Sequence, residues 1–410
     1  MKTLPEIDAL VPEMKEWRHH IHAHPETAFE ESQTSAFVAD KLRAFGLDVH
    51  TGMAKTGVVG VLRGNGKNSD SNAIGLRADL DALHVHERSG VPYTSRNAGK
   101  MHACGHDGHT TMLLGAAKAL AAKGSCDGTI YFIFQPAEEN EGGGRVMVEE
   151  GLFDKFPMRA VYGMHNWPRK PLGSFAMRVG PLMAAYDVFE IVVTGKGAHA
   201  AMPYTGKDPM LFVAHVINAL QTIVARNLHP LDAGVVSVTQ VHGGDTWNVI
   251  PQEVVLRGTV RTFKREVQDL IEQRMLAIVA GVAATFEMSA TLRYERRYPA
   301  LVNAETETRH AIAAATAIVG SENVDTDPMP EMGSEDFAFM LQAKPGCYVW
   351  LGAGRGPDTP NIHSPQYDFD DEALAIGASY WVTLAEQQLS AGTAPAHAQP
   401  VTLGQPTRRR

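Results

Sequence analysis

The sequence predicts an α/β protein in which helices cover both faces of a mostly parallel β-sheet, with an α+β domain inserted into it. In the first third of the chain, helical segments alternate with short buried strands, the order typical of a parallel sheet. From about residue 186 this order changes, and after residue 299 the alternation returns. At 410 residues the chain is also longer than one simple core, so two domains are expected.

The first segment, residues 1–184, is expected to form the first part of the larger domain. Apolar residues spaced by three and four predict helices over residues 7–21 and 32–45. A run of helix-forming residues predicts a third helix over residues 110–120. Apolar runs bounded by charge or proline predict buried strands, at residues 73–79, 128–135 and 160–164.

The middle segment, residues 185–296, is predicted to form a separate α+β domain. Its elements follow the order strand, helix, strand, strand, helix, strand, at residues 188–194, 209–227, 235–241, 253–263, 267–284 and 289–294. This is the split βαβ, or ferredoxin-like, order.

The last segment, residues 297–390, is expected to complete the larger domain with a strand at 347–351 and a helix at 372–390. The smaller domain is therefore predicted to be an insertion into the larger one. Residues 391–410 are rich in proline, alanine and threonine and end in an arginine run, which predicts a disordered tail.

Composition and charge narrow the class of protein. The formal net charge is −9, which argues against a nucleic-acid partner and against an anionic membrane partner. The sequence has no unbroken apolar stretch of the roughly 18 residues that a membrane span needs, and its N-terminal residues have no apolar signal core. Three cysteines, Cys104, Cys126 and Cys347, cannot form a disulfide framework, so a cytoplasmic location is expected.

Residues 101–109 (MHACGHDGH) carry most of the chemistry that the sequence reveals. They hold one thiol, three imidazoles and one carboxylate, and thiolate and imidazole are ligands that borderline-soft divalent metals prefer. Within this segment, His102 and His109 are expected to support metal ligands rather than to bind metal. Taken alone, Cys104 is compatible with a small buried hydrophobe, or with a nucleophile that His106 activates as a base.

Further possible metal ligands follow the predicted strands of the larger domain: the pair Glu138–Glu139, then His165 and His363. The carboxyl ends of parallel strands meet in one crevice, so these side chains are expected to converge with those of residues 101–109. Each of these groups is weak evidence for a metal site by itself. An acidic pair often lies in the solvent-exposed first turn of a helix, and a single histidine is often a core residue. Together they predict a metal site.

Five converging donors exceed the four that one tetrahedral zinc ion requires. They suit a pair of metal ions that share a ligand and a water molecule. The adjacent acids Glu138 and Glu139 also allow a division of labour, in which one binds metal and the other takes a proton from water.

Three motifs resemble those of the hippurate hydrolase and N-acyl-amino-acid amidohydrolase branch of the aminoacylase and carboxypeptidase G-like metallopeptidases. They are residues 101–109, residues 135–139 (QPAEE) and residues 197–203 (GAHAAMP), and the similarity runs from about residue 10 to residue 390. The resemblance implies a zinc-peptidase-like α/β domain with an inserted ferredoxin-like lid through which the protein dimerises.

The resemblance also implies a role for each residue of the larger domain's site. Two divalent metal ions per subunit, zinc or manganese, would be bound by Cys104, His106, Glu139, His165 and His363. Glu138 would be the general base, and Asp79 would orient the metal ligands.

The resemblance also implies one further catalytic residue and several substrate-binding residues. His199 matches a lid residue that stabilises the tetrahedral oxyanion, often from the partner subunit. Asn248 and Arg261 match substrate-binding positions of the lid, and an arginine suits a bidentate grip on a carboxylate. Gly333 and Ser334 match a segment that lines the cleft.

The sequence therefore predicts a two-metal amidohydrolase that cleaves the amide bond of an N-acyl amino acid, a small hippurate-like molecule. A homodimer or higher homo-oligomer through the lid is expected. Arg77 departs from the wider superfamily, in which many members have a metal-binding histidine there, and this leaves the bridging ligand and the metal open. Two alternatives are a dipeptidase or aminopeptidase on the same scaffold, and a catalytically silent metal- or ligand-binding protein. The acyl group, the amino acid and the stereochemistry stay open.

Overall fold

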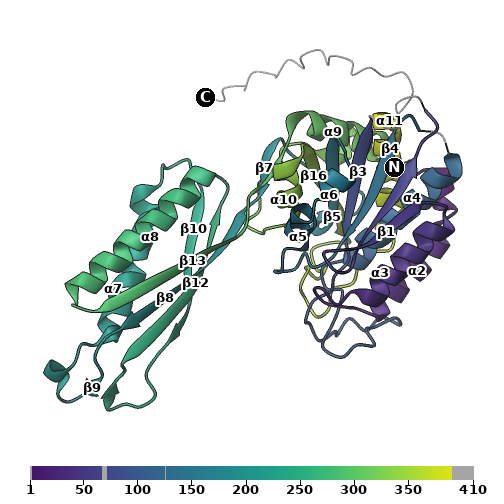
Figure 1. Cartoon of the computed structure of the whole chain (residues 1–410). Helices are drawn as coiled ribbons and strands as arrows, with labels where there is room; N and C mark the ends of the chain where they lie inside the picture. Colours follow the sequence, from purple (N-terminus) through teal and green to yellow (C-terminus); the bar gives the residue numbers. More distant parts are fainter. Residues whose placement is uncertain (1, 67–71, 125, 390–410) are drawn as a thin grey trace.

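The computed structural model describes residues 2–66, 72–124 and 126–389, so the predicted tail at residues 391–410 lies outside the described residues. The described chain forms two units (Figure 1). The large unit is built around an eight-stranded sheet and the small unit around a four-stranded sheet. Two adjacent strands of the small unit, β8 and β13, connect it to the large unit (Figure 1).

The sheet of the large unit is mostly parallel at its centre. In spatial order its strands are β1 (Asp48–Met53), β2 (Gly57–Arg63), β4 (Thr129–Gln135), β3 (Ala73–Asp79), β5 (Ala160–Pro171), β16 (Gly346–Gly354), β6 (Phe175–Ala176) and β15 (Val324–Asp325). The pairs formed by β4, β3, β5 and β16 are parallel, whereas the hairpin of β1 and β2 is antiparallel. Four strand ends are thereby brought to one edge of the sheet.

Side chains that alternate along the buried strands contribute to two separate hydrophobic cores, one on each face of the sheet. Successive side chains of a strand point to opposite faces, so Ile130, Phe132 and Phe134 of β4 join one core while Tyr131 and Ile133 join the other. The first face is covered by α1 (Pro5–Asp8), α2 (Val11–Ala23), α3 (Ser32–Ala44), α4 (His106–Lys123), α9 (Glu305–Val319) and α11 (Ala373–Leu389). The second is covered by α5 (Gly143–Glu149), α6 (Leu152–Lys155) and α10 (Phe337–Ala343).

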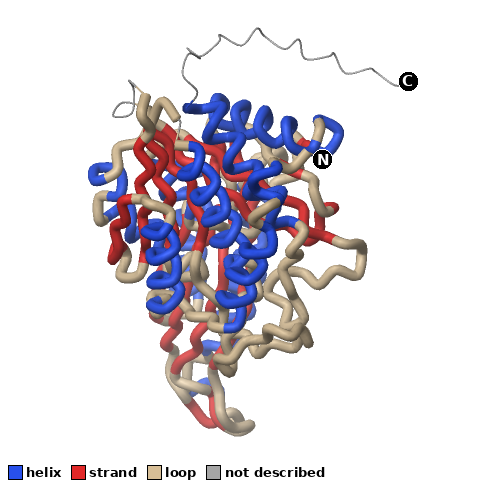
Figure 2. The backbone as a smooth tube through the Cα atoms, turned by 90° about the vertical axis from the view of Figure 1, so that its right-hand side faces the viewer, coloured by secondary structure: helices blue, strands red, loops and turns tan. Residues whose placement is uncertain are grey.

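The predicted fold class is therefore confirmed: a mostly parallel sheet has helices on both faces. Figure 2 shows several of these helices in front of the strands. The helix predicted over residues 7–21 is instead two helices, α1 and α2, because Pro12 starts a new helix in its first turn, where its missing N–H costs no hydrogen bond. Likewise, the helix predicted from residue 110 already begins at His106.

The start of α4 depends on a glycine. Gly105 has φ +94°, and a Cβ atom at this position would lie 1.8 Å from Oδ1 of Asn166. Only glycine combines this conformation with so close an approach. Gly105 therefore lets the chain turn sharply between Cys104 and His106, against Asn166 in the middle of β5.

The small unit has the ferredoxin-like order that the sequence predicts. Its elements are β8 (Ala185–Thr194), α7 (Pro209–Thr222), β10 (Gly234–His242), β12 (Glu253–Thr262), α8 (Arg265–Thr285) and β13 (Ser289–Tyr298), and the sheet order is β10-β12-β8-β13. All neighbouring strands are antiparallel. Buried residues alternate along β8, and Phe189, Ile191 and Val193 pack with residues of α7 and α8.

Two short two-stranded sheets accompany the small unit. β7 (Gly180–Met183) pairs with β14 (Leu301–Asn303) at the connection to the large unit, and β9 (Ala198–His199) pairs with β11 (Val249–Ile250). β9 lies at the tip of the small unit that is far from the large unit (Figure 1). One helical stretch, residues 209–227, is long and apolar enough for a membrane span by length and composition, but Phe212, Val216 and Leu220 pack in the small unit's core.

Candidate functional site

A cavity of about 350 Å³ lies where the strands of the large sheet end, next to the connection to the small unit. Its walls include four of the predicted metal ligands, the predicted base and three predicted substrate-binding residues: Cys104, Glu139, His165, His363, Glu138, Arg261, Gly333 and Ser334. Trp167 and Glu335, which the sequence also associates with the cleft, line it as well, and Leu83, Tyr186, Tyr298 and Ile362 were not predicted as part of the site. The cavity therefore combines groups from both units.

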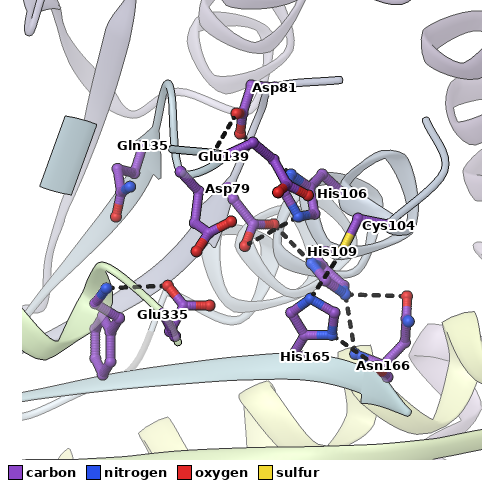
Figure 3. Close-up of polar contacts among 12 residues, drawn as sticks. Asp79, Asp81, Cys104, His106, His109, Gln135, Glu139, His165, Asn166 and Glu335 are labelled. Carbon is purple, nitrogen blue, oxygen red and sulfur yellow. Dashed lines mark hydrogen bonds and ion pairs between the residues drawn. The ribbon is translucent and has the colours of Figure 1, made fainter. Parts of the chain in front are cut away.

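The five predicted metal ligands lie together, as three overlapping groups show. Ligand atoms lie within 4.8 Å of one another in the group of Cys104, His106 and His165, in that of Cys104, Glu139 and His363, and in that of His106, Glu138 and Glu139. Sγ of Cys104 is 3.3 Å from Nε2 of His165 (Figure 3). On the other side, Nε2 of His363 is 3.1 Å from Oε1 of Glu139.

Two buried histidines, His106 and His165, each use Nδ1 for orientation and turn Nε2 toward the cluster. Nδ1 of His106 is 3.2 Å from Oδ1 of Asp81, and its Nε2 is buried without a hydrogen-bond partner. Nδ1 of His165 donates to the carbonyl oxygen of Asn166 at 2.7 Å. A fixed Nδ1–H leaves the Nε2 lone pair free for a metal ion.

His109, in contrast, has both ring nitrogens engaged. Its Nδ1 is 2.6 Å from Oδ1 of Asp79 and its Nε2 accepts from the backbone N–H of Asn166 at 2.9 Å (Figure 3). It has no free lone pair for a metal ion and fits the supporting role expected from the sequence.

The charges around the cluster fit a bound cation. Burial and the negative charges of Glu139 and Glu138 raise the pKa of the Cys104 thiol well above its usual range. Burial lowers the pKa of His106, but the charges of Asp79 and Asp81 outweigh it and raise the pKa to about 10. A divalent cation would offset the clustered carboxylates and favour the thiolate, so the donor set and its charge fit divalent metal.

Glu138 lies beside the donors in a crowded acidic environment. Burial raises the pKa of its carboxyl well above the usual value, and the charges of Glu335 and Glu139 raise it further. Oε1 of Glu138 is 3.4 Å from the backbone nitrogen of Asp336, and its carbonyl oxygen accepts from the Tyr298 hydroxyl at 2.6 Å. These contacts fix a carboxyl group that is suited to accept a proton.

Two predicted site residues, the catalytic His199 and the substrate-binding Asn248, lie elsewhere. His199, in β9, and Asn248, next to β11, do not line this cavity. Both are exposed, and they are neighbours, because the backbone N–H of Ala200 donates to the carbonyl oxygen of Asn248 at 2.9 Å. The structure thus separates the five donors from His199 and Asn248 within one chain.

Comparison with known proteins identifies the family. The model of the peptidase family M20/M25/M40 matches residues 75–387. The chain belongs to this family. The resemblance predicted from the three motifs is therefore confirmed.

Relatives cover most of this M20 family member. It is 41% identical to an N-acetyl-L-cysteine deacetylase of Bacillus subtilis, over 91% of this chain and 87% of that protein. It is 38% identical to a hippurate hydrolase of Campylobacter jejuni, over 95% of this chain and 100% of that protein. A solved structure from Bacillus subtilis, described as a dinuclear metal binding peptidase from the M20 family, matches with a TM-score of 0.81 and 33% identity, over 93% of this chain and 99% of that one. The protein is thus an amidohydrolase or metallopeptidase.

Arg77 of this M20 family member is a buried partner of carboxylates. Its guanidinium contacts the carboxylates of Asp79 at 2.8 Å, Glu335 at 3.0 Å and Asp336 at 3.2 Å, and its Nε donates to Gln135 at 2.8 Å. Arg77 therefore links the end of β3, which carries Asp79, to residues 335–336, which lie next to Glu138.

Asp81 was missed as a site residue. The sequence assigned the orientation of metal ligands to Asp79, yet Asp81 holds Nδ1 of His106 and also accepts from the backbone N–H of Glu139 at 3.0 Å. Its position was a usable signal, since it follows Asp79 at the end of the same strand. Glu335 belongs to the segment that the sequence places at the cleft, but its contact with Arg77 gave no signal, because it spans more than 250 residues of sequence.

Proposed function

We propose that the protein hydrolyses the amide bond of N-acyl amino acids and releases a carboxylic acid and a free amino acid. The observation that carries the proposal is one cavity with a cluster of metal-ligating side chains, a buried carboxyl group and an arginine. The similarity to an N-acetyl-L-cysteine deacetylase and a hippurate hydrolase supports this substrate class.

Cys104, His106, Glu139, His165 and His363 are proposed to hold two divalent metal ions, zinc or manganese. Bound there, the ions would polarise the amide carbonyl and lower the pKa of the attacking water. Asp81 and the carbonyl of Asn166 hold the imidazoles of His106 and His165 in the orientation for binding, which is the function of such supporting hydrogen bonds.

Glu138 is proposed to be the general base. Its carboxylate takes a proton from the water that attacks the carbonyl carbon and gives this proton to the leaving amine when the C–N bond breaks. A raised pKa suits both steps, because the carboxyl group must hold the proton between them. Asp79 is proposed to position the site through His109 and Arg77.

Arg261 is proposed to bind the carboxylate of the amino-acid half, with Gly333 and Ser334 beside it. Its Nη1 donates to Oγ1 of Thr259 at 2.8 Å, and its guanidinium lies 4.1 Å from the ring centre of Tyr186. Among the described residues, Nη2 and Nε of Arg261 have no hydrogen-bond partner, so they are available for a bidentate contact. This contact favours a free carboxylate next to the scissile amide.

His199 and Asn248 are proposed to complete the cavity of a second copy of the chain. We propose that residues 185–296 form an inserted lid and dimerisation domain, between catalytic segments at residues 1–184 and 297–390. The exposed tip that carries His199 and Asn248 also exposes Tyr204, Trp247 and Val249, and exposed apolar side chains of this kind mark protein interfaces. In the dimer, His199 is proposed to stabilise the oxyanion and Asn248 to contact the substrate.

Hydrolysis of three substrates tests the proposal. Hippurate, N-acetyl-methionine and Gly-Leu are incubated with chelator-treated enzyme and with the same enzyme after zinc or manganese is restored. Release of amino acid from the two acylated substrates, only with metal, is the expected result. Cleavage of Gly-Leu alone would show a dipeptidase instead, and metal binding without turnover of any substrate would contradict the proposed activity.

A further inference from the structure

A second cavity, of about 590 Å³, adjoins the candidate active site. The two cavities share Leu83, Glu139 and Asn140 as walls. The second one is otherwise lined by residues of the large unit, which come from residues 27–30, Lys55, residues 82–84 and Glu141. It reaches the metal-ligand cluster at Glu139 and has no wall from the small unit. We call it the side cavity.

The side cavity has a mixed lining: Ala28, Phe29, Ala82 and Leu83 form an apolar patch, and the other seven lining residues are polar or charged. Phe29 and Leu83 are half-buried and Ala82 is buried, whereas Glu30, Lys55 and His84 are exposed. Nζ of Lys55 lies 4.8 Å from the ring centre of Phe29, and Glu30 pairs with Lys100 at 2.7 Å. A concave surface that combines an apolar patch with polar groups is a usual form of a small-molecule site.

Unusual backbone conformations gather at the side cavity. Among the described residues, seven that are not glycine have positive φ, and three of these, Phe29 (60°), Lys55 (69°) and Asn140 (70°), line it. Such conformations are costly for residues with side chains and concentrate at functional sites. The fold therefore holds these three residues in backbone conformations that residues with side chains rarely adopt.

Buried hydrogen bonds connect this wall to the loop that carries Glu138 and Glu139. The Glu31 carboxylate, fully buried, accepts from the backbone N–H of Ala137 at 2.9 Å and from the hydroxyl of Thr56 at 2.6 Å. These bonds tie the segments of Phe29 and Lys55 to the catalytic loop. The side cavity thus has a fixed position relative to the metal-ligand cluster.

The positions of the two cavities bear on which half of a bound substrate lies in which cavity. Arg261 lies at the wall that the small unit contributes, so the amino-acid half of the substrate would face the small unit. The acyl half extends from the other side of the scissile carbonyl, and the side cavity adjoins Glu139 without a lining residue from the small unit. We propose that the side cavity binds the acyl group, and that it takes an apolar acyl chain longer than acetyl, packed on Phe29 and Leu83. This inference rests on the proposed amidohydrolase activity.

Two substrates that differ only in the acyl chain test the inference. The kcat/KM values of metal-loaded enzyme are measured for N-acetyl-methionine and N-octanoyl-methionine. Each methylene buried in an apolar site is worth about fourfold in binding, so the octanoyl substrate is expected to have a kcat/KM at least about tenfold higher. Phe29→Ala is expected to lower the ratio of the two values about tenfold. Ala28→Trp introduces a large side chain at a residue that lines the cavity, and this variant is also expected to lower the ratio of the two kcat/KM values.

Phe153→Ala is the matched control. Phe153 is also half-buried at the edge of the same core and also lies beneath a lysine, with Nζ of Lys344 at 5.8 Å from its ring centre, but it lines neither cavity. This variant should keep the wild-type ratio.

The outcomes separate the two proposals. Turnover of both substrates with a ratio that neither Phe29→Ala nor Ala28→Trp changes would overturn the acyl site and leave the amidohydrolase intact. A wild-type preference for the acetyl substrate would do the same. Turnover of neither substrate by metal-loaded enzyme would overturn the amidohydrolase and the acyl site with it.

Discussion

The large and small units hold their proposed functional residues in opposite ways. In the large unit, Cys104, His106 and His165 are at most 5% exposed, and hydrogen bonds to buried neighbours orient the two histidines. In the small unit, His199 and Asn248 lie at an exposed tip, beside a fully exposed Trp247. Strand ends of one sheet can assemble a set of donors within one chain, whereas residues at an exposed tip need a second surface to act on a substrate.

The largest expected effect concerns the buried base of the large unit. Glu138→Gln should lower kcat by about 10²–10⁴-fold, because the amide cannot accept a proton from water. Metal content, measured by elemental analysis, should be unchanged. Glu149→Gln, at an exposed glutamate of α5, is the control. Wild-type turnover of the Glu138→Gln variant with metal bound would refute the assignment.

The next effect tests whether the tip of the small unit acts on a partner chain. His199→Ala should lower kcat by about 10²–10³-fold, the usual loss for one oxyanion donor. When this variant is mixed with Glu138→Gln and the dimers exchange subunits, activity should return, because one site of each hybrid has both intact residues. His229→Ala, at another exposed histidine of the small unit, should keep full activity. If the mixture stays inactive although hybrids form, His199 does not act across the dimer.

A smaller effect is expected for the carboxylate behind the metal ligands. Asp81→Asn should weaken metal binding by about 10–100-fold, because it disturbs the hydrogen bond that holds His106. Competition with a chromophoric chelator measures this change. The matched variant Asp245→Asn, at an exposed position of the small unit, should bind metal as the wild type does. Equal affinities of the two variants would show that the contact with His106 is dispensable.

The smallest effect concerns stability in the large unit. Burial lowers the pKa of His22, but its hydrogen bonds with Asp107 and Glu87 outweigh this and raise the pKa to about 9. A raised folded-state pKa stabilises the protein below the unfolded value of 6.5, and the contribution disappears as pH rises from about 6.5 to 9. It amounts to at most about 3 kcal/mol.

Urea unfolding at pH 6 and pH 9.5 measures this contribution. His22→Gln should lose more free energy of unfolding, relative to wild type, at pH 6 than at pH 9.5. His215→Gln, at an exposed histidine of α7, is the control in the small unit and should show no such pH-dependent loss. An equal loss for His22→Gln at both pH values would contradict the assigned pKa.

Local sequence patterns were sufficient for the fold class and the family. Alternation of apolar segments predicted the strands β3, β4 and β5, because buried parallel strands need continuous apolar runs. The hairpin of β1 and β2 was not predicted. Exposed residues weaken the apolar pattern of β1, whereas the buried apolar run of β2 was a usable signal that was missed. The motif at residues 101–109 carried the metal-site prediction because its donors are close in sequence. The roles given to the individual site residues stay predictions.

The sequence by itself determined the order of donors and strands along the chain and the turn at Gly105, which are local properties, although it ended β5 at residue 164 and the structure places His165 within this strand. Only the tertiary structure decided which groups face one another. It placed Glu335 and Asp336 on Arg77 and gave the orientation of His106 to Asp81. It also put β9, which carries His199, at the end of the small unit far from β7 and the large unit (Figure 1). Such contacts join segments that are distant in sequence, and their geometry depends on how two sheets and their helices pack, which no local pattern encodes.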